Sequence, residues 1–232
     1  MPNRRGLIIL ITMIVSFCSI SYELLLAQAL SAFLENTVLR YSVTIGLYLF
    51  ALGLGARAAE GRMLQQPVLQ LLKIETALTL IGGFLIIGLY GFDNVFGATL
   101  IFSVIVHGLI LMIGFLSGME LPLLMAMLKE ENSENIILGF SYFGAVIGTF
   151  VFAVWFYPVI GLMQTAFIVG ALNGCAGVIL NLFRDKINPE FSKNFYITLY
   201  IQLFLFFSIS VCWLNSDAIS QFCLQLYLNR GA

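Results

Sequence analysis

The sequence predicts an all-α protein, a polytopic integral membrane bundle of about seven transmembrane helices. Of its 232 residues 60% are hydrophobic and 10% are charged, and the mean hydropathy is +1.00. These values are not typical of soluble domains. Residues 135–183 contain no Asp, Glu, Lys, Arg or His over 49 positions (183 − 135 + 1). At about 1.5 Å per residue, this segment is too long for one crossing of a hydrocarbon core roughly 30 Å thick.

The same length criterion gives seven spans in chain order. They are residues 7–30, 41–57, 74–92, 97–118, 136–157, 161–182 and 195–214. The first span follows Arg4 and Arg5, as a secretory signal peptide would, but it is too long and lacks a small-residue cleavage site. We therefore expect a retained helix. Pro158 and Gly161 mark a tight turn between the fifth and sixth spans. We expect one domain, residues 1–215, and a short C-terminal tail, residues 216–232.

The fourth hydrophobic region is longer than a single straight crossing of the membrane requires. It covers residues 96–128, which is 33 positions (128 − 96 + 1), and contains Pro122. We expect helix four to break between Gly118 and Pro122. Transporters use the free backbone groups of such broken helices to hold ions and substrates. The alternative is a helix that leaves the membrane at Gly118 and continues along its inner surface.

The placement of Lys and Arg predicts a cytoplasmic N-terminus. With that orientation, nine of the eleven basic residues lie inside and only Arg40 and Arg230 lie outside. The nine are Arg4, Arg5, Arg57, Arg62, Lys73, Lys129, Arg184, Lys186 and Lys193. An odd number of spans puts the C-terminal tail outside, a conclusion that a re-entrant segment would change. We expect the plasma (inner) membrane of a prokaryote, with the lipid bilayer as solvent.

Pairs of glycines four residues apart predict close contacts between helices, because small residues let backbones approach in lipid. The pairs are Gly114 and Gly118, Gly144 and Gly148, and Gly170 and Gly174.

Three glutamates lie in otherwise apolar surroundings. Glu23 is the only charged residue within residues 6–34, Glu120 is the only one within residues 94–128, and Glu75 belongs to a third helix. A charged group at the centre of a membrane helix costs roughly 2.5–3.5 kcal/mol on insertion scales, so such groups usually face a bundle interior, a cavity or a partner. We therefore treat these carboxylates as candidate ligand-binding groups.

Motifs for soluble chemistry are absent from the sequence. The segment Gly53–Ala58 superficially matches a dinucleotide fingerprint, but it closes a membrane helix and follows no strand. His107 is the only histidine, so no histidine pair exists for zinc. The four cysteines lack metal-binding spacing, and a bridge between Cys212 and Cys223 stays open as an alternative to free thiols. We expect no metal, no cofactor and no nucleic-acid partner.

Four blocks of the sequence resemble the N-terminal transmembrane region of membrane-bound spermidine synthases. They are SISYELLL at 19–26, YSVTIGLYLFALGLG at 41–55, Ile74-Glu75 before Gly82-Gly83, and LSGMELPLL at 116–124. In that family, the membrane helices precede a soluble aminopropyltransferase domain, which uses decarboxylated S-adenosylmethionine to extend a diamine. This chain ends near the point where that domain would begin, so we expect the membrane module without the transferase. Ser141 stands before Tyr142 where the family pattern would place an acidic residue.

The resemblance and the glutamates lead to a first hypothesis, a non-catalytic module and hence not an enzyme. It would bind, sense or pass a small polyamine-like cation, together with a separately encoded membrane or soluble protein partner. Aromatic faces would add cation–π attraction of about 0.5–2 kcal/mol each. The candidate ligand-binding residues are Glu23, Glu120, Glu75, Tyr22, Tyr142, Ser141, His107 and Asn173.

The second hypothesis is a structural subunit that anchors or organises a larger membrane complex. In that case, hydroxyls and amides would satisfy the glutamates, or desolvation would keep them protonated. Such polar groups stabilise contacts between helices by roughly 0.6–2 kcal/mol.

Overall fold

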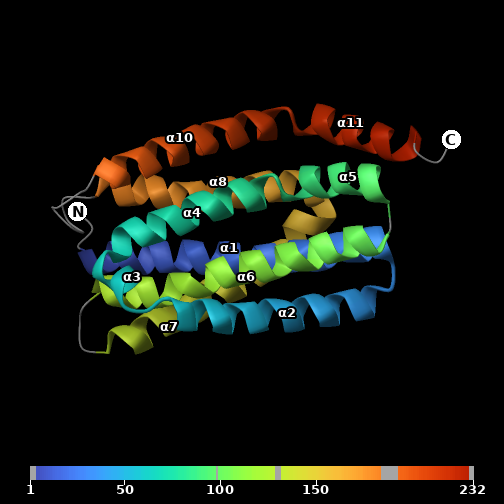
Figure 1. The fold of residues 1–232 in the computed structure, drawn as a ribbon. Coiled ribbons are helices and arrows are strands. Elements are labelled where there is room, and N and C mark those ends of the chain that lie inside the picture. Colours follow the sequence, from blue (N-terminus) through green and yellow to red (C-terminus); the bar gives the residue numbers. More distant parts are fainter. Residues whose placement is uncertain (1–3, 98, 129–131, 184–192, 230–232) are drawn as a thin grey trace.

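The computed structural model describes residues 4–97, 99–128, 132–183 and 193–229, and every regular element within them is a helix (Figure 1). The helices are α1 (Arg4–Leu34), α2 (Thr37–Ala58), α3 (Arg62–Gln65), α4 (Pro67–Gly83), α5 (Leu85–Phe96), α6 (Leu100–Leu128), α7 (Ser133–Val151), the π-helix η1 (Phe152–Ile160), α8 (Leu162–Leu182), α10 (Lys193–Leu214) and α11 (Ser216–Asn229). The predicted all-α class is confirmed.

The lengths of the helices agree with the predicted spans. Six are long and apolar enough to cross a membrane, and the bent pair of α4 and α5 makes a seventh if it counts as one span. The turn predicted at Gly161 is present, since this residue ends η1 with a φ of 86°. Beyond the last predicted span, the region expected to be a tail contains α11.

The break predicted between Gly118 and Pro122 is wrong, because α6 continues through Pro122 to Leu128. A proline inside a helix costs about 3 kcal/mol or more through its missing N–H and the clash with the carbonyl four residues earlier. That earlier residue is Gly118, whose backbone packs so closely on Leu52 of α2 that a Cβ would overlap the Leu52 main chain. We attribute the continuity of α6 to this packing. The chain bends instead at Phe84, by 51° between α4 and α5.

The glycine pairs make the close contacts that their spacing predicts. A Cβ on Gly114 would approach the Tyr48 carbonyl oxygen of α2 to 2.9 Å, and one on Gly144 would approach the Met13 carbonyl oxygen of α1 to 2.5 Å. A Cβ on Gly170 would lie 2.6 Å from the Cα of Gly83 in α4. These contacts are all within the chain, so the small residues serve its internal packing.

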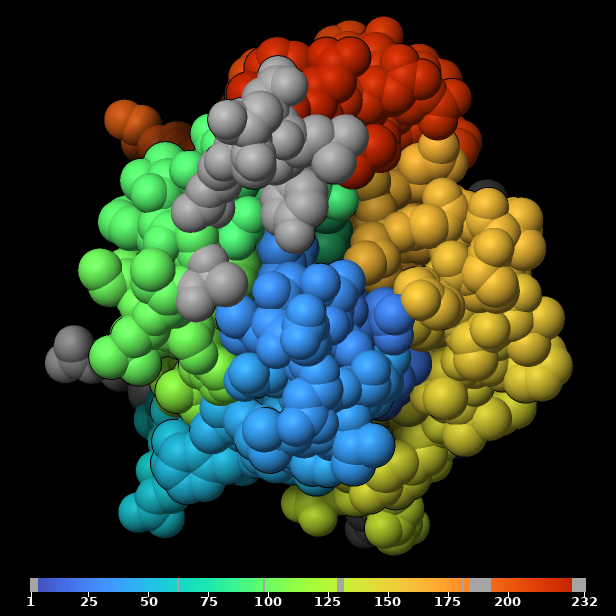
Figure 2. Space-filling model, turned by 90° about the vertical axis from the view of Figure 1, so that its right-hand side faces the viewer, coloured from blue at the N-terminus to red at the C-terminus, as the bar shows by residue number. Residues whose placement is uncertain are grey.

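Helix α1 occupies the centre of the bundle. It packs against α2, α6, α7 and α8, and the end-on view shows the α1–α2 turn surrounded by the remaining helices (Figure 2). At the other end of the bundle, the Arg4 guanidinium donates a 2.8 Å hydrogen bond to the Met127 carbonyl oxygen near the end of α6. Arg57 and Lys193 lie at this same end (Figure 1). We call it the basic end. Lys129, Arg184, Lys186 and Arg230 lie outside the described residues.

Candidate functional site

Four polar residues from four helices lie at one level of the bundle. Glu75 follows the start of α4 by eight residues (75 − 67), and Glu120 precedes the end of α6 by eight (128 − 120). Asn173 precedes the end of α8 by nine (182 − 173), and Gln202 follows the start of α10 by nine (202 − 193). These four helix termini all lie at the basic end (Figure 1). At 1.5 Å per residue, each side chain starts roughly 12–14 Å from it.

These four residues, which we call the polar layer, are buried. Glu75, Asn173 and Gln202 are 0% exposed, and Glu120 is 2% exposed. Buried polar groups in proteins are normally hydrogen-bonded, and a buried group without a partner costs about 1–3 kcal/mol. The hydrogen bonds of the polar layer therefore decide what it can do.

Two hydrogen bonds fix the orientation of the side-chain amides in the polar layer. Asn173 Nδ2 donates to the main-chain oxygen of Glu75 at 3.3 Å. Gln202 Nε2 donates to Thr79 Oγ1 at 3.2 Å and to the Gly174 carbonyl oxygen at 3.4 Å. Because a carbonyl oxygen only accepts, neither amide can be reversed without losing its bond. The oxygens Asn173 Oδ1 and Gln202 Oε1 therefore remain acceptors, and neither has a partner within the described residues.

The Glu75 carboxyl group is the centre of the polar layer. Neither of its oxygens has a hydrogen-bond partner in the described part of the chain. It interacts electrostatically with Glu120 of α6, and both carboxyls interact with Cys18 and Tyr22 of α1. Among the side chains that the structure describes, no Lys, Arg or His is buried. The two acids thus share a region without a basic partner from the same described residues.

The donors beside the carboxyls already bind backbone oxygens. Tyr22 OH donates to the Leu78 carbonyl oxygen at 3.4 Å, and Cys18 Sγ donates to the Val169 carbonyl oxygen at 3.7 Å. Gly82 makes room for the Tyr22 ring, because a Cβ at that position would overlap it. These two donors are therefore occupied, and the Glu75 carboxyl receives no hydrogen bond from them.

Of the eight residues that the sequence suggested, the structure brings four together, namely Tyr22, Glu75, Glu120 and Asn173. Glu23 is 7% exposed, and the electrostatic contact that links it to this region is with Tyr48. The Tyr48 hydroxyl donates to the Ser19 carbonyl oxygen at 2.9 Å and to Ser117 Oγ at 3.2 Å, so it joins α1, α2 and α6.

The other three suggested residues lie elsewhere. Ser141 Oγ accepts a 2.8 Å hydrogen bond from Ser16 and so connects α7 to α1. Its neighbour Tyr142 is 68% exposed on the outer face of α7. The ring Nδ1 of His107 lies 2.6 Å from the Ser103 carbonyl oxygen in its own helix. None of these contacts reaches the polar layer.

Sequence reasoning missed Gln202. A signal was present, because Gln202 is the only Asn, Gln or charged residue between Asn194 and Asn215. The same criterion of isolation had singled out Glu23 and Glu120.

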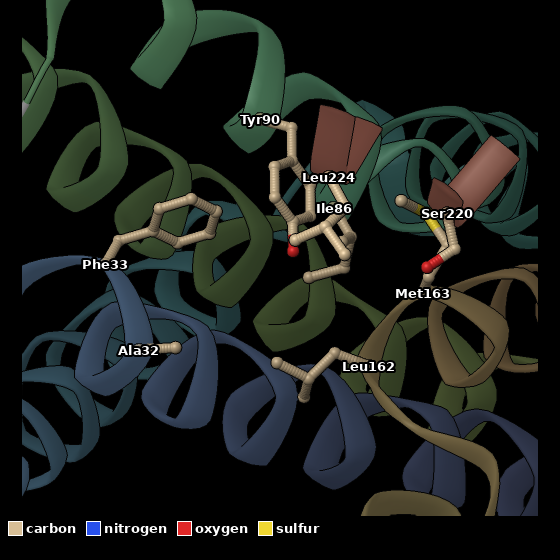
Figure 3. Close-up of a pocket in the computed structure, with 8 residues that line it drawn as sticks. All are labelled: Ala32, Phe33, Ile86, Tyr90, Leu162, Met163, Ser220 and Leu224. Carbon is tan, nitrogen blue, oxygen red and sulfur yellow. The ribbon is translucent and has the colours of Figure 1, made fainter. Parts of the chain in front are cut away.

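A pocket of about 320 Å³ lies at the opposite end of the bundle from the polar layer (Figure 3). Its lining comes from α1, α5, α8 and α11, and consists of Ala32, Phe33, Ile86, Tyr90, Leu162, Met163, Ser220 and Leu224. The Phe33 and Tyr90 rings meet edge to face at 5.2 Å between centroids. With one serine hydroxyl and one phenol in an otherwise apolar lining, the pocket offers no charged group to an amine.

Three relatives show what this chain is similar to. It is 36% identical over 166 residues to the polyamine aminopropyltransferase of Leptospira interrogans, which covers 69% of this chain and 32% of that protein. It is 32% identical over 187 residues to polyamine aminopropyltransferase 1 of Streptomyces coelicolor, and the match covers 78% of this chain and 34% of that protein. For the polyamine aminopropyltransferase of Oceanobacillus iheyensis, the identity is 33% over 180 residues, and the match covers 75% of this chain and 35% of that protein. The chain is similar to polyamine aminopropyltransferases.

The chain spans about a third of the length of these curated relatives. No protein-family model matches it, and no solved structure matches it. The expected similarity to spermidine synthases is thus confirmed as similarity to polyamine aminopropyltransferases. That the shared part is their N-terminal membrane region stays a prediction.

The relatives are named as enzymes, and this contradicts two of the predictions made from the sequence. The non-catalytic module is wrong, and so is the prediction that the protein is not an enzyme. Both predictions relied on where the chain ends and on missing motifs for soluble chemistry. The similarity instead extends over 69–78% of the chain and points to an enzymatic role. The structural-subunit alternative gains no support from these relatives.

Proposed function

We propose that this chain is the membrane-embedded helical part of a polyamine aminopropyltransferase. The observation that carries the proposal is 32–36% identity to proteins of that name over 69–78% of the chain. The function is aminopropyl transfer to an amine by the enzyme of which these helices form part. The resemblance to spermidine synthases implies decarboxylated S-adenosylmethionine as donor and a diamine as acceptor.

The outer surface of the bundle supports the membrane part of the proposal. Large apolar side chains stand exposed on it, among them Phe150 at 68%, Phe204 at 69% and Val146 at 66%. Large apolar side chains exposed on several helices are the normal lipid-facing surface of a membrane bundle. The proposed location is the inner membrane, as for a bacterial enzyme, with the basic end on the cytoplasmic side.

Aminopropyl transfer by the purified protein tests the proposal. The full-length protein, tagged and extracted from its native membranes in mild detergent with everything bound to it, is incubated with decarboxylated S-adenosylmethionine and radiolabelled putrescine. We expect labelled spermidine, in an amount that follows the protein through gel filtration. Untagged membranes taken through the same purification are the control. Product no higher than in that control, with putrescine, cadaverine and spermidine each tried as acceptor, would overturn the proposal.

A further inference from the structure

The polar layer has more buried acceptors than donors. Four oxygens lack a hydrogen-bond partner within the described residues, namely Glu75 Oε1, Glu75 Oε2, Asn173 Oδ1 and Gln202 Oε1. Of the neighbouring donors, Tyr22 OH, Cys18 Sγ and the Gln202 amide bind other oxygens, as does one of the two N–H groups of Asn173. Each orphaned acceptor would cost about 1–3 kcal/mol if it stayed unpaired, so this arrangement favours a bound donor group.

Two arrangements can supply the missing donors, namely protonated acids or a bound ammonium group. A proton on Glu75 turns one of the four oxygens into a donor and leaves three acceptors. A proton on Glu120, the second N–H of Asn173 Nδ2 and the hydroxyl hydrogen of Thr79 are the other available donors. A dry layer with both acids protonated is therefore the alternative, and it would bind no amine. A primary ammonium group supplies three N–H donors, no acceptor and a positive charge. It would donate to three of the four acceptors and neutralise a carboxylate at the same time.

We propose that the polar layer binds the primary ammonium end of a polyamine, which donates hydrogen bonds to the free oxygens of Glu75, Asn173 and Gln202. Glu120 supplies a second carboxylate beside Glu75. Tyr22 interacts electrostatically with both carboxyls and so brings an aromatic ring to this region, and cations interact favourably with ring faces. This inference deepens the proposed function, on which it rests, by naming the substrate group that these helices recognise. The four residues come from four helices, so binding would also hold α4, α6, α8 and α10 together.

Equilibrium binding of radiolabelled putrescine to the purified full-length protein, without aminopropyl donor and at constant ionic strength, tests the inference. We expect Glu75→Gln and Glu120→Gln to weaken binding by about tenfold or more, because each removes a charge-assisted interaction. Glu23→Gln is the matched control, because it changes a buried carboxyl outside the polar layer. Glu134→Gln is a second control at an exposed carboxyl. Both should bind as the wild type does. Unchanged affinity in correctly folded Glu75→Gln and Glu120→Gln proteins would overturn the inference.

A second arm needs no variant, so it stands even if Glu75→Gln fails to fold. Putrescine with both nitrogens fully methylated keeps two charges but has no N–H donor. We expect it to compete at least about tenfold more weakly than putrescine, since only the donors have been removed. Equal competition would overturn hydrogen-bonded recognition. Displacement by Na⁺ or K⁺ at the concentration of putrescine itself would show an alkali-metal site and would likewise overturn the inference.

The two proposals fail separately. Putrescine binding that depends on Glu75, without any aminopropyl transfer, would overturn the proposed function and support the amine site. Aminopropyl transfer together with putrescine binding that is unaffected by substitution of Glu75 and Glu120 would overturn the amine site and support the proposed function.

Discussion

The side-chain amide of Asn173 donates its hydrogen bond to the main-chain oxygen of Glu75, 98 positions away in the sequence. Through this contact, α8 holds the turn of α4 that carries Glu75, the most buried acidic residue among those the structure describes. The bond also fixes the Asn173 oxygen as an acceptor beside that carboxyl. Position 173 therefore matters for both the packing and the polarity of the site.

Asn173→Ala should lower the stability of the protein. It removes a buried hydrogen bond and leaves a small cavity, so we expect a loss of roughly 1–3 kcal/mol in the free energy of unfolding. The measurement is unfolding in mixed detergent and dodecyl sulfate. Asn194→Ala, at the exposed start of α10, is the control and should change stability by less than about 0.5 kcal/mol. Equal effects of the two variants would mean that the contact with Glu75 contributes nothing specific.

Gly118→Ala should be strongly destabilising, because the new methyl group would overlap the Leu52 backbone. Overpacking of this kind typically costs about 1–3 kcal/mol, and here backbone atoms would have to move. The same helix offers a matched control in Gly108, which has no atom within 4 Å of the position its Cβ would take. Gly108→Ala should be neutral or stabilising by up to about 1 kcal/mol through helix propensity. Thermal denaturation in detergent compares the two, and a tolerated Gly118→Ala would refute the tight α2–α6 contact.

Pro122→Ala should stabilise the protein, since α6 is continuous at this position. The substitution restores an N–H that can bond to the Gly118 carbonyl oxygen and removes the ring clash, with an expected gain of about 1–3 kcal/mol. Pro67→Ala is the comparison, because Pro67 lies at the first position of α4, where proline is well tolerated. It should have little effect. A destabilised Pro122→Ala variant would instead support a functional break in α6.

Tyr48→Phe should loosen the contact between α1, α2 and α6. The hydroxyl is buried and bonds to Ser19 and Ser117, so its removal leaves a buried carbonyl without this donor and costs roughly 1–2 kcal/mol. Tyr200→Phe is the control, since Tyr200 is 69% exposed on α10. Heat denaturation of the two variants is the measurement. Equal denaturation temperatures of the two variants would show that the hydrogen bonds of the Tyr48 hydroxyl contribute no net stability.

The proposed orientation predicts which turns face the outside of the cell. In a version of the protein whose four cysteines are replaced, Glu35→Cys in the α1–α2 turn should react with a membrane-impermeant maleimide on intact cells. Glu60→Cys, in the exposed turn after α2, should react only after the cells are opened. The opposite pattern would reverse the orientation, and labelling of both on intact cells would contradict a membrane-spanning α2.

The order and approximate positions of the long helices could be predicted from the sequence, because span length and apolar composition are local properties. The continuation of α6 to Leu128 and the helix α11 in the expected tail were not predicted. The bend was misplaced for a physical reason. Pro122 is a strong local signal, but tertiary packing at Gly118 overrides it. The actual bend at Phe84 follows Gly82 and Gly83, which also pack against other helices, so their presence in the sequence does not by itself indicate a bend.

The candidate site could be predicted only in part. Isolation in apolar sequence singled out Glu120, and it would have found Gln202 as well. It could not say which face of a helix points inward, which is why Tyr142 joined the candidates although it is 68% exposed. Counting residues from the helix ends would have placed Glu75, Glu120, Asn173 and Gln202 at one level, but only once the direction of each helix was known.

The central position of α1 bears on how the protein is made. This helix is synthesised before α2, α6, α7 and α8, the helices that enclose it. Until α2 supplies Tyr48 and α4 supplies the Leu78 carbonyl oxygen, Glu23 and the Tyr22 hydroxyl lack these neighbours. The insertion machinery or surrounding lipid must accommodate them in the meantime. Packing around α1 is therefore expected to finish late, when α8 closes against the helix that was made first.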